Sequence, residues 1–215
     1  MKTSPTAEPT DYLQPASGGR FTEDSLLLAR FLPEELDGRA ADFGAGCGVV
    51  GLEALALGRL KGVKELFFVE AQAIFQSCLA LNVERAAQRA GDRRPDAPAL
   101  RILEADWRAL RPASFSGRLD LLAANPPYFP ADASGPTRAN RLGFRHETLG
   151  SLADLTLAAA RLLAPGGRLC LSWPRRRLSV LTTAAAVAGL TAARFHLPPR
   201  AGATLILAEY VRPGR

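Results

Sequence analysis

Residues 39–57 restrict the fold of this chain more tightly than any other stretch of it. Arg39-Ala40-Ala41-Asp42-Phe43 is typical of a short buried strand, and Gly44-Ala45-Gly46-Cys47-Gly48 is a Gly-x-Gly-x-Gly turn. Apolar side chains at helical spacing follow through Leu57. Glycines let the backbone approach a ligand closely, and the start of the helix presents free N–H groups. The stretch therefore predicts a strand–turn–helix unit of an open α/β sheet with a binding site at the turn.

The turn differs from the dinucleotide-binding pattern, because Gly48 comes two residues after Gly46 and not three. Downstream, the apolar run 66–69 predicts a buried strand that ends in Glu70. A carboxylate in this place suits a ribose diol, since it can accept from both hydroxyls. The alternative is a solvated strand end. We expect Glu70 to bind a ribose.

A third predicted strand, residues 99–104, leads to Asp106 and Trp107. Asp106 can accept a hydrogen bond from the exocyclic amine of adenine, and Trp107 can cover a ring face. A structural cap of the next turn is an alternative role for Asp106.

A fourth predicted strand, residues 119–124, ends in Asn125-Pro126-Pro127-Tyr128. Proline fixes φ and has no N–H, so the two prolines stiffen the loop. The side-chain oxygen of Asn125 and the carbonyl of Pro126 can then accept from one planar amino group, which makes that amine a better nucleophile. Tyr128 offers a flat ring for stacking. The alternative is an ordinary strand-ending turn, but the four motifs fall at successive strand ends, where an open α/β sheet binds its ligands.

With these motifs, nearly the whole chain resembles the class I S-adenosylmethionine-dependent methyltransferases that methylate amines, either adenine N6 or glutamine N5. The resemblance implies direct methyl transfer and a Rossmann-like fold. It implies catalytic roles for Asn125, Pro126, Pro127 and Tyr128. It implies that S-adenosylmethionine is bound by Asp42, Gly44, Ala45, Gly46, Cys47, Gly48, Glu70, Asp106, Trp107 and Asn125.

Within that branch, residues 14–29, 138–141 and 145–148 are most similar to the bacterial enzymes that methylate adenine N6 next to the anticodon of valine tRNA. The resemblance implies a tRNA substrate. We expect Tyr128 and Phe129 to enclose the base, and we expect phosphate contacts from Arg138, Arg141 and Arg145, for which the alternative is a solvated face. Residues 175–177, all arginine, are a second candidate for phosphate contacts.

Two other functions remain open. One is glutamine N5 methylation of a translation release factor, disfavoured because such enzymes usually carry a helical domain before the cofactor domain and only about forty residues precede the turn here. The other is a non-catalytic nucleotide- or RNA-binding module, disfavoured by the intact Asn-Pro-Pro-Tyr motif.

Length and composition indicate the number of domains and the kinds of partner and site to expect. With 215 residues, 47% of them hydrophobic, we expect one α/β domain over residues 12–215 after a flexible tail, residues 1–11. A net charge of +6 suits a polyanionic partner. Three isolated cysteines fit a reducing cytoplasm, two lone histidines predict no metal site, and no apolar run is long enough for a membrane span.

The pattern predicts a mainly parallel sheet with helices on both faces, closed by a C-terminal antiparallel hairpin. The helices are expected at 23–31, 49–57, 71–90, 151–163 and 178–188, and the hairpin strands at 191–197 and 204–211. The inner face of the third helix is expected to include Phe75, Cys78, Leu79, Leu81 and Asn82, and Pro165-Gly166-Gly167 is expected to end the fourth helix.

Overall fold

The structure is a computed structural model that describes residues 12–16, 20–91, 96–126, 150–199 and 204–214. The expected tail, residues 1–11, lies outside the described residues. So do the expected site residues Pro127, Tyr128, Phe129, Arg138, Arg141 and Arg145.

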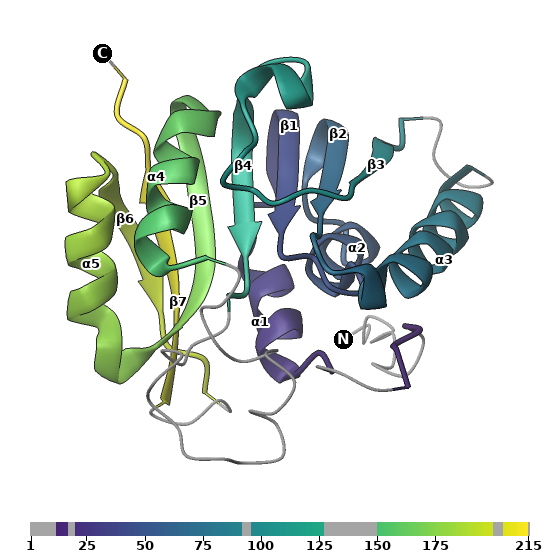
Figure 1. The fold of residues 1–215 in the computed structure, drawn as a ribbon, viewed down its shortest axis with the longest axis horizontal. Helices are drawn as coiled ribbons and strands as arrows, with labels where there is room; N and C mark the ends of the chain where they lie inside the picture. Colours follow the sequence, from purple (N-terminus) through teal and green to yellow (C-terminus); the bar gives the residue numbers. More distant parts are fainter. Residues whose placement is uncertain (1–11, 17–19, 92–95, 127–149, 200–203, 215) are drawn as a thin grey trace, which may run out of the picture.

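Seven strands form one sheet in the order β3-β2-β1-β4-β5-β7-β6 (Figure 1). Strands β1 to β5 run parallel, while β7 is antiparallel to both β5 and β6. The predicted mainly parallel sheet with a C-terminal antiparallel hairpin is confirmed. The strand bounds are β1 Glu35–Phe43, β2 Lys61–Val69, β3 Ala99–Leu103, β4 Leu119–Ala124, β5 Leu163–Pro174, β6 Thr191–His196 and β7 Leu205–Val211.

Five α-helices cover the two faces of the sheet (Figure 1). Their bounds are α1 Glu23–Phe31, α2 Val49–Ala56, α3 Ala73–Gly91, α4 Leu152–Leu162 and α5 Leu178–Val187. Alternate residues of each strand point to opposite faces, so Ala40 and Leu121 pack toward α1, α2 and α3, while Ala41 and Leu122 pack toward α4 and α5. Burial on both faces explains why the central strands are apolar almost throughout.

Three details differ from the sequence predictions. Strands β1 and β2 start earlier than predicted, at Glu35 and Lys61, because the polar first halves of these strands still pair with each other. Leu81 was expected on the inner face of α3 but is 45% exposed, and Val83 is buried there instead. Helix α4 ends at Leu162, since the backbone of Leu163 is already extended.

Pro165-Gly166-Gly167 was expected to end α4 and instead lies within β5. The amide of Gly166 donates to the carbonyl of Arg212 at 2.8 Å, and the amide of Arg212 donates to the carbonyl of Gly167 at 2.9 Å. These bonds extend the sheet through a segment whose composition is typical of a turn.

Within the described ranges, no helix has the length and apolar character needed to cross a bilayer. Nor do three or more histidine, cysteine, aspartate or glutamate side chains in those ranges gather as a metal site would require.

Candidate active site

The strand register brings the sequence motifs together at one edge of the sheet. Phe43, the last residue of β1, is paired with Val69 of β2 and Ala124 of β4. The residues that follow them, including Glu70 and Asn125, therefore start from neighbouring points on the carboxyl edge. Residues 26–81 positions apart along the chain thus share one site because parallel strands end together.

The glycine turn is shaped for close approach by a ligand. Gly44, Gly46 and Gly48 have φ values of 64°, 55° and 83°, which other residues rarely adopt. The amides of Gly44 and Ala45 both donate to the carbonyl of Val69, at 2.9 and 3.1 Å. A Cβ on Gly48 would lie 2.9 Å from Leu79, whereas a Cβ on Gly46 would meet no atom of the described residues within 4 Å. The turn is packed at Gly48 and open at Gly46.

Glu70 lies next to that open position. One carboxylate oxygen, Oε2, accepts from the amide of Gly46 at 2.8 Å, and the other, Oε1, accepts from the amide of Gln72 at 2.8 Å. The residue is only 3% exposed, so the alternative of a solvated strand end is wrong. Each oxygen keeps a second lone pair, which is the acceptor capacity a ribose diol needs. Ribose binding by Glu70 stays a prediction.

Asp42 contributes to the turn through the helix that follows it. Its carboxylate is buried and accepts from the amide of Gly51, the third residue of α2, at 3.0 Å. Burial raises the pKa of Asp42 to about 7, and the nearby charge of Glu70 adds to the rise, while the bond from Gly51 opposes it. In the described contacts, Asp42 holds the start of α2 against the end of β1.

Cys47 faces the core beside the turn. It packs with Leu26, Val49 and Phe75, and burial raises the pKa of its thiol to about 12. The side chain is therefore a neutral packing group at physiological pH.

Asn82 of α3 ties the N-terminal segment to the glycine turn. Its amide nitrogen donates to the carbonyls of Cys47 and Leu13, both at 3.0 Å, and its amide oxygen accepts from the amide of Leu13 at 2.9 Å. Sequence reasoning placed Asn82 on the inner face of α3 without a role. The available signal was a buried amide among apolar positions, since such a group must find partners.

Asp106 is held by its own turn. Its carboxylate accepts from the amide of Arg108 at 2.9 Å and from the Arg108 guanidinium at 2.9 Å. The bond from the Arg108 side chain lowers the pKa of Asp106. These contacts agree with the structural-cap interpretation. An additional contact to adenine stays a prediction.

Trp107 lies between the glycine turn and Gly150. Its ring stacks on Phe43 with centroids 6.0 Å apart and planes 4° from parallel. A Cβ on Gly44 would come within 3.4 Å of the indole, and a Cβ on Gly150 within 2.9 Å. The buried indole Nε1 has no hydrogen-bond partner among the described residues. Trp107 thus lines the edge of the site and retains a donor.

Asn125 is held from two sides by hydroxyl groups. Its Nδ2 donates to Oγ of Ser25 in α1 at 2.9 Å, and its Oδ1 accepts from Oγ of Ser172 in β5. Both serines are buried, at 5% and 0% exposure. These two bonds fix the plane of the Asn125 amide.

Sequence reasoning did not find Ser25 or Ser172. Each is a single hydroxyl inside an apolar run, and a buried hydroxyl needs a partner. The sequence does not reveal that this partner is Asn125, because the three residues meet only when α1, β4 and β5 pack together.

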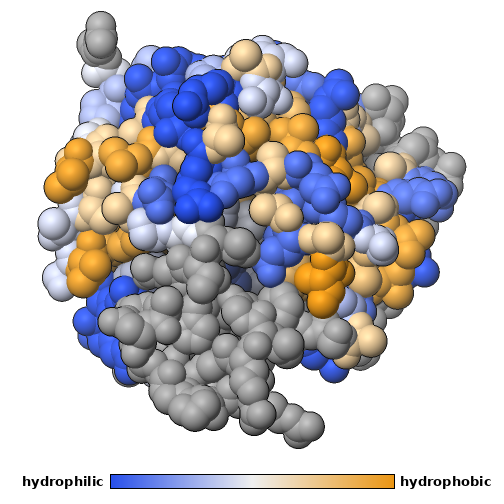
Figure 2. Space-filling view, viewed as in Figure 1, coloured by the Kyte–Doolittle hydropathy of each residue, from blue (hydrophilic) through white to orange (hydrophobic). Residues whose placement is uncertain are grey.

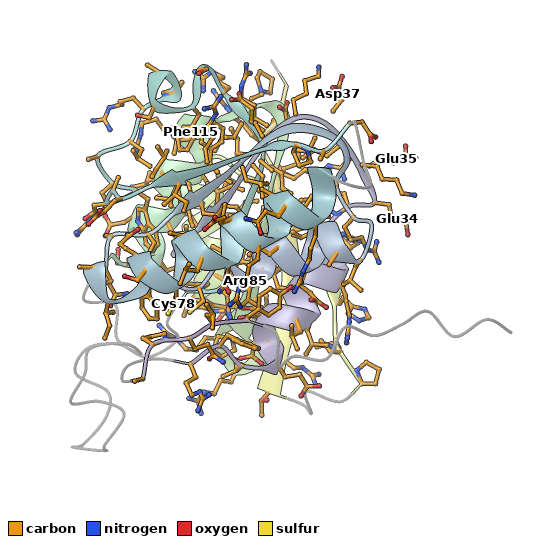
Figure 3. The ribbon with its side chains drawn as sticks, turned by 90° about the vertical axis from the view of Figure 1, so that its right-hand side faces the viewer. Glu34, Glu35, Asp37, Cys78, Arg85 and Phe115 are labelled. Atoms are coloured by element: carbon orange, nitrogen blue, oxygen red, sulfur yellow. The ribbon has the colours of Figure 1, made fainter. Side chains whose placement is uncertain are left out.

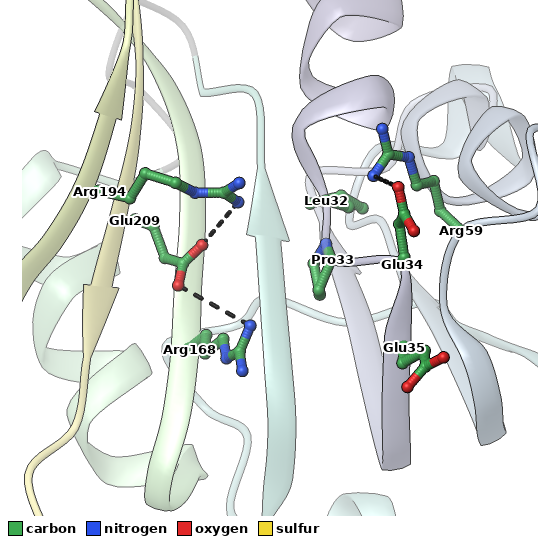
Figure 4. A pocket seen from close by; sticks show the side chains of 8 residues that line it. All are labelled: Leu32, Pro33, Glu34, Glu35, Arg59, Arg168, Arg194 and Glu209. Atoms are coloured by element: carbon green, nitrogen blue, oxygen red, sulfur yellow. Dashed lines mark hydrogen bonds and ion pairs between the residues drawn. The ribbon is translucent and has the colours of Figure 1, made fainter.

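A separate cavity of about 560 Å³ lies at the amino-terminal end of β1 (Figure 4). Five of its six charged side chains form ion pairs: Glu209 contacts Arg194 at 2.8 Å and Arg168 at 3.9 Å, and Glu34 contacts Arg59 at 3.3 Å. In the view of Figure 3, Glu34 and Glu35 lie on one side of the molecule, and Cys78 of α3 lies on the other side. The cavity contains none of the residues at the carboxyl edge.

No protein-family model matches the chain. Among curated proteins, it is 30% identical over 188 residues to a tRNA1(Val) (adenine(37)-N6)-methyltransferase of Porphyromonas gingivalis, an alignment that spans 81% of this chain and 66% of the relative. It is also 37% identical over 100 residues to a 4-amino-L-phenylalanine/4-methylamino-L-phenylalanine methyltransferase of Streptomyces pristinaespiralis, spanning 43% of this chain and 34% of that protein.

Two solved structures show the same fold. TrmN from Thermus thermophilus superposes with a TM-score of 0.59 at 23% identity, covering 87% of this chain and 48% of that one. A precorrin-6y C5,15-methyltransferase from Geobacter metallireducens superposes with a TM-score of 0.61 at 13% identity, covering 96% and 97%. Together with the strand order, these likenesses show that the chain has the Rossmann-like fold of class I methyltransferases.

Proposed function

We propose that the protein transfers a methyl group from S-adenosylmethionine to an exocyclic amine, adenine N6 of tRNA next to the anticodon. The observation that carries the proposal is the amide of Asn125, fixed by Ser25 and Ser172 at the same sheet edge as the open glycine turn. The name of the Porphyromonas gingivalis relative supports the tRNA substrate.

The residues at the carboxyl edge fit S-adenosylmethionine. Gly46 leaves room for a ligand, and Glu70 beside it has acceptor capacity for the ribose hydroxyls. Trp107 presents a buried N–H donor next to Gly150, and the other side of its indole ring lies against Gly44. When bound, the cofactor supplies a methyl group that is electrophilic because it is attached to a sulfonium.

The contribution of the protein is orientation of the amine. The side-chain oxygen of Asn125 and the carbonyl of Pro126 accept the two hydrogens of the target amine. The nitrogen lone pair then points along the line of transfer, and proximity with orientation lowers much of the barrier. An adenine base must leave its stack to reach such a pocket, so a loop adenosine is an easier target than a paired one.

The contacts to the substrate base and backbone extend the proposal beyond the described residues. Tyr128 and Phe129 enclose the base, and Arg138, Arg141 and Arg145 bind phosphates. Arg175 and Arg176 are exposed and follow directly after β5, at the same edge as Asn125, which supports an additional phosphate contact there.

One other amine substrate has a specific observation in its favour. The Streptomyces pristinaespiralis relative is named for methylation of 4-amino-L-phenylalanine, which carries an aromatic amine. Release-factor glutamine remains the protein alternative, and both belong in the same assay.

The assay incubates the purified protein with labelled S-adenosylmethionine and, separately, with total tRNA, release factors and 4-amino-L-phenylalanine. We expect label in tRNA only, and we expect nuclease digestion and mass spectrometry to identify it as N6-methyladenosine. Label in a release-factor glutamine or in the free amino acid, with unlabelled tRNA, would contradict the proposed substrate.

A further inference from the structure

Three arginines line the junction between the β3–β4 connection and the end of α4. Arg111 lies in that connection, Arg118 directly precedes β4, and Arg161 lies in the last turn of α4. We call these three residues the arginine track. Arg111 and Arg118 are exposed, and Arg161 is partly exposed.

Backbone carbonyls hold Arg111 and Arg161 together. Nη1 of Arg111 donates to the carbonyl of Leu110 at 3.0 Å, and Nε of Arg161 donates to the same oxygen at 3.3 Å. Nη2 of Arg161 also donates to the carbonyls of Trp107 and Arg108, at 3.4 and 3.2 Å. Two guanidinium groups therefore converge on a single oxygen atom.

Arg118 continues the track along the end of α4. Its Nη1 donates to the carbonyl of Arg161 at 2.7 Å and to the carbonyl of Leu163 at 3.2 Å. The three guanidinium groups are thus fixed by the backbone, which lowers the entropy lost when they bind a ligand.

The charges of the track are not neutralised. Across the described ranges, none of the three arginines forms an ion pair, whereas Arg39 and Arg101 share Glu65 and Arg194 contacts Glu209. Together with burial, the neighbouring charge of Arg111 lowers the pKa of Arg161. Each guanidinium has five N–H donors, so donors remain after the carbonyl bonds are made.

The track spans the sheet from its amino-terminal edge, where Arg118 precedes β4, toward the turn after β3. The turn that accepts from Arg161 also carries Trp107, which lies against the glycine turn. In the view of Figure 2, hydrophilic surface covers the region where the β3–β4 connection meets α4, and Figure 1 places both elements on the same side of the sheet.

We propose that the arginine track binds the sugar–phosphate backbone of the substrate RNA, at a distance of a few nucleotides from the one whose base enters the site. The inference rests on the proposed function and names a surface for its substrate. Phosphates recur along a polynucleotide, and a row of fixed guanidinium groups without acidic partners matches such a repeated anion. A protein substrate has no comparable periodic charge.

The test compares two double variants that remove equal charge. Arg111→Gln/Arg118→Gln changes the track, and glutamine keeps an N–H donor for the backbone carbonyls. Arg85→Gln/Arg89→Gln is the matched control, because these arginines are exposed on α3, which packs on the other face of the sheet (Figure 3). Affinity for unmodified tRNA is measured at several salt concentrations, with affinity for S-adenosylmethionine and thermal midpoint alongside.

Counterion release predicts that each lost phosphate contact reduces the slope of log affinity against log salt by about 0.7–0.9. We expect the track variant to lose about 1.5 of this slope. We also expect its tRNA affinity to fall by about tenfold or more near 0.1 M salt. Cofactor affinity and thermal midpoint should match the wild type, and the control variant should keep the wild-type slope.

A further variant, Arg111→Lys/Arg118→Lys, separates charge from local structure. It should retain the salt slope that the glutamine variant loses, and equal loss in both variants would overturn the inference in favour of a structural role. A track variant that keeps the wild-type slope would also overturn it, while leaving the proposed function intact. A wild-type protein that neither binds nor methylates tRNA would instead overturn the proposed function.

Discussion

At the scale of single residues, the site depends on how the Asn125 amide is held. An amide that accepts from a substrate amine must present its oxygen in a fixed plane, and two buried hydroxyls do this from opposite sides. Under the proposed function, Ser25 and Ser172 are positioning residues, which act on the substrate through Asn125.

Removal of one hydroxyl should impair turnover more than binding. We expect Ser172→Ala to lower kcat by about 2–10-fold, which corresponds to one hydrogen bond of about 0.5–1.5 kcal/mol. Ser25→Ala should behave similarly, because it frees the other side of the same amide. Steady-state kinetics with titration calorimetry for S-adenosylmethionine would check this. A change in KM or cofactor affinity with kcat preserved would argue against the positioning role.

A second prediction at the residue scale concerns Glu70 and the affinity for the cofactor. Glu70→Ala removes the acceptor for the ribose hydroxyls and should weaken S-adenosylmethionine binding by about 1.5–3 kcal/mol, the range for hydrogen bonds to a charged group. Glu70→Gln keeps an acceptor for the Gly46 amide and serves as the control for the shape of the turn. If calorimetry gives the same affinity for Glu70→Ala and wild type, Glu70 does not bind the ribose.

At the scale of elements, the junction of β1 and α2 contains a titrating carboxyl. The pKa of Asp42 is 3.8 in its ordinary state and about 7 in the fold. Between these values the folded protein keeps a proton that the unfolded chain releases, so Asp42 lowers the free energy of unfolding as pH rises through that window.

Asp42→Asn should remove this pH dependence, because an amide oxygen can still accept from Gly51 without a charge. We expect the free energy of unfolding to fall less between pH 5 and 8 in Asp42→Asn than in wild type, and the variant to be the more stable protein at pH 8. Urea unfolding at several pH values measures both. Asp106→Asn is the control, since the pKa of that carboxyl is lowered and its titration lies below this range. Parallel pH profiles for Asp42→Asn and wild type would contradict the account.

The elements themselves were predictable where local pattern decides the structure. Glu23–Phe31 was predicted to the residue, because its apolar spacing is regular and Pro33 follows closely. The predicted element boundaries were wrong where pairing between distant segments determines the structure. Pro165-Gly166-Gly167 is an example, because hydrogen bonds to Arg212 make this segment part of β5. The same reason explains the site: its strand-end motifs were readable in order, but Ser25, Asn82 and Ser172 gain their roles only through packing between distant segments.

At the scale of the whole molecule, charge and chemistry are divided between two ends of the sheet. The carboxyl edge carries the glycine turn, Glu70 and Asn125, and the arginine track connects the amino-terminal end of β4 with the turn that carries Trp107. In the cavity next to β1, Glu34 and Glu209 are instead paired with Arg59 and Arg194. A polyanion is therefore expected to approach along the track, and the net charge of +6 favours its encounter.

The central claim, methylation of adenine N6 in tRNA by Asn125 chemistry, is tested most directly by nucleoside mass spectrometry of tRNA from a strain that lacks the gene. We predict that one N6-methyladenosine, next to the anticodon, disappears in that strain. It should return with the wild-type gene and stay absent with Asn125→Ala, although that variant should bind S-adenosylmethionine with nearly wild-type affinity. Persistence of every N6-methyladenosine in the deletion strain, with loss of the methyl group from a release-factor glutamine, would contradict the account.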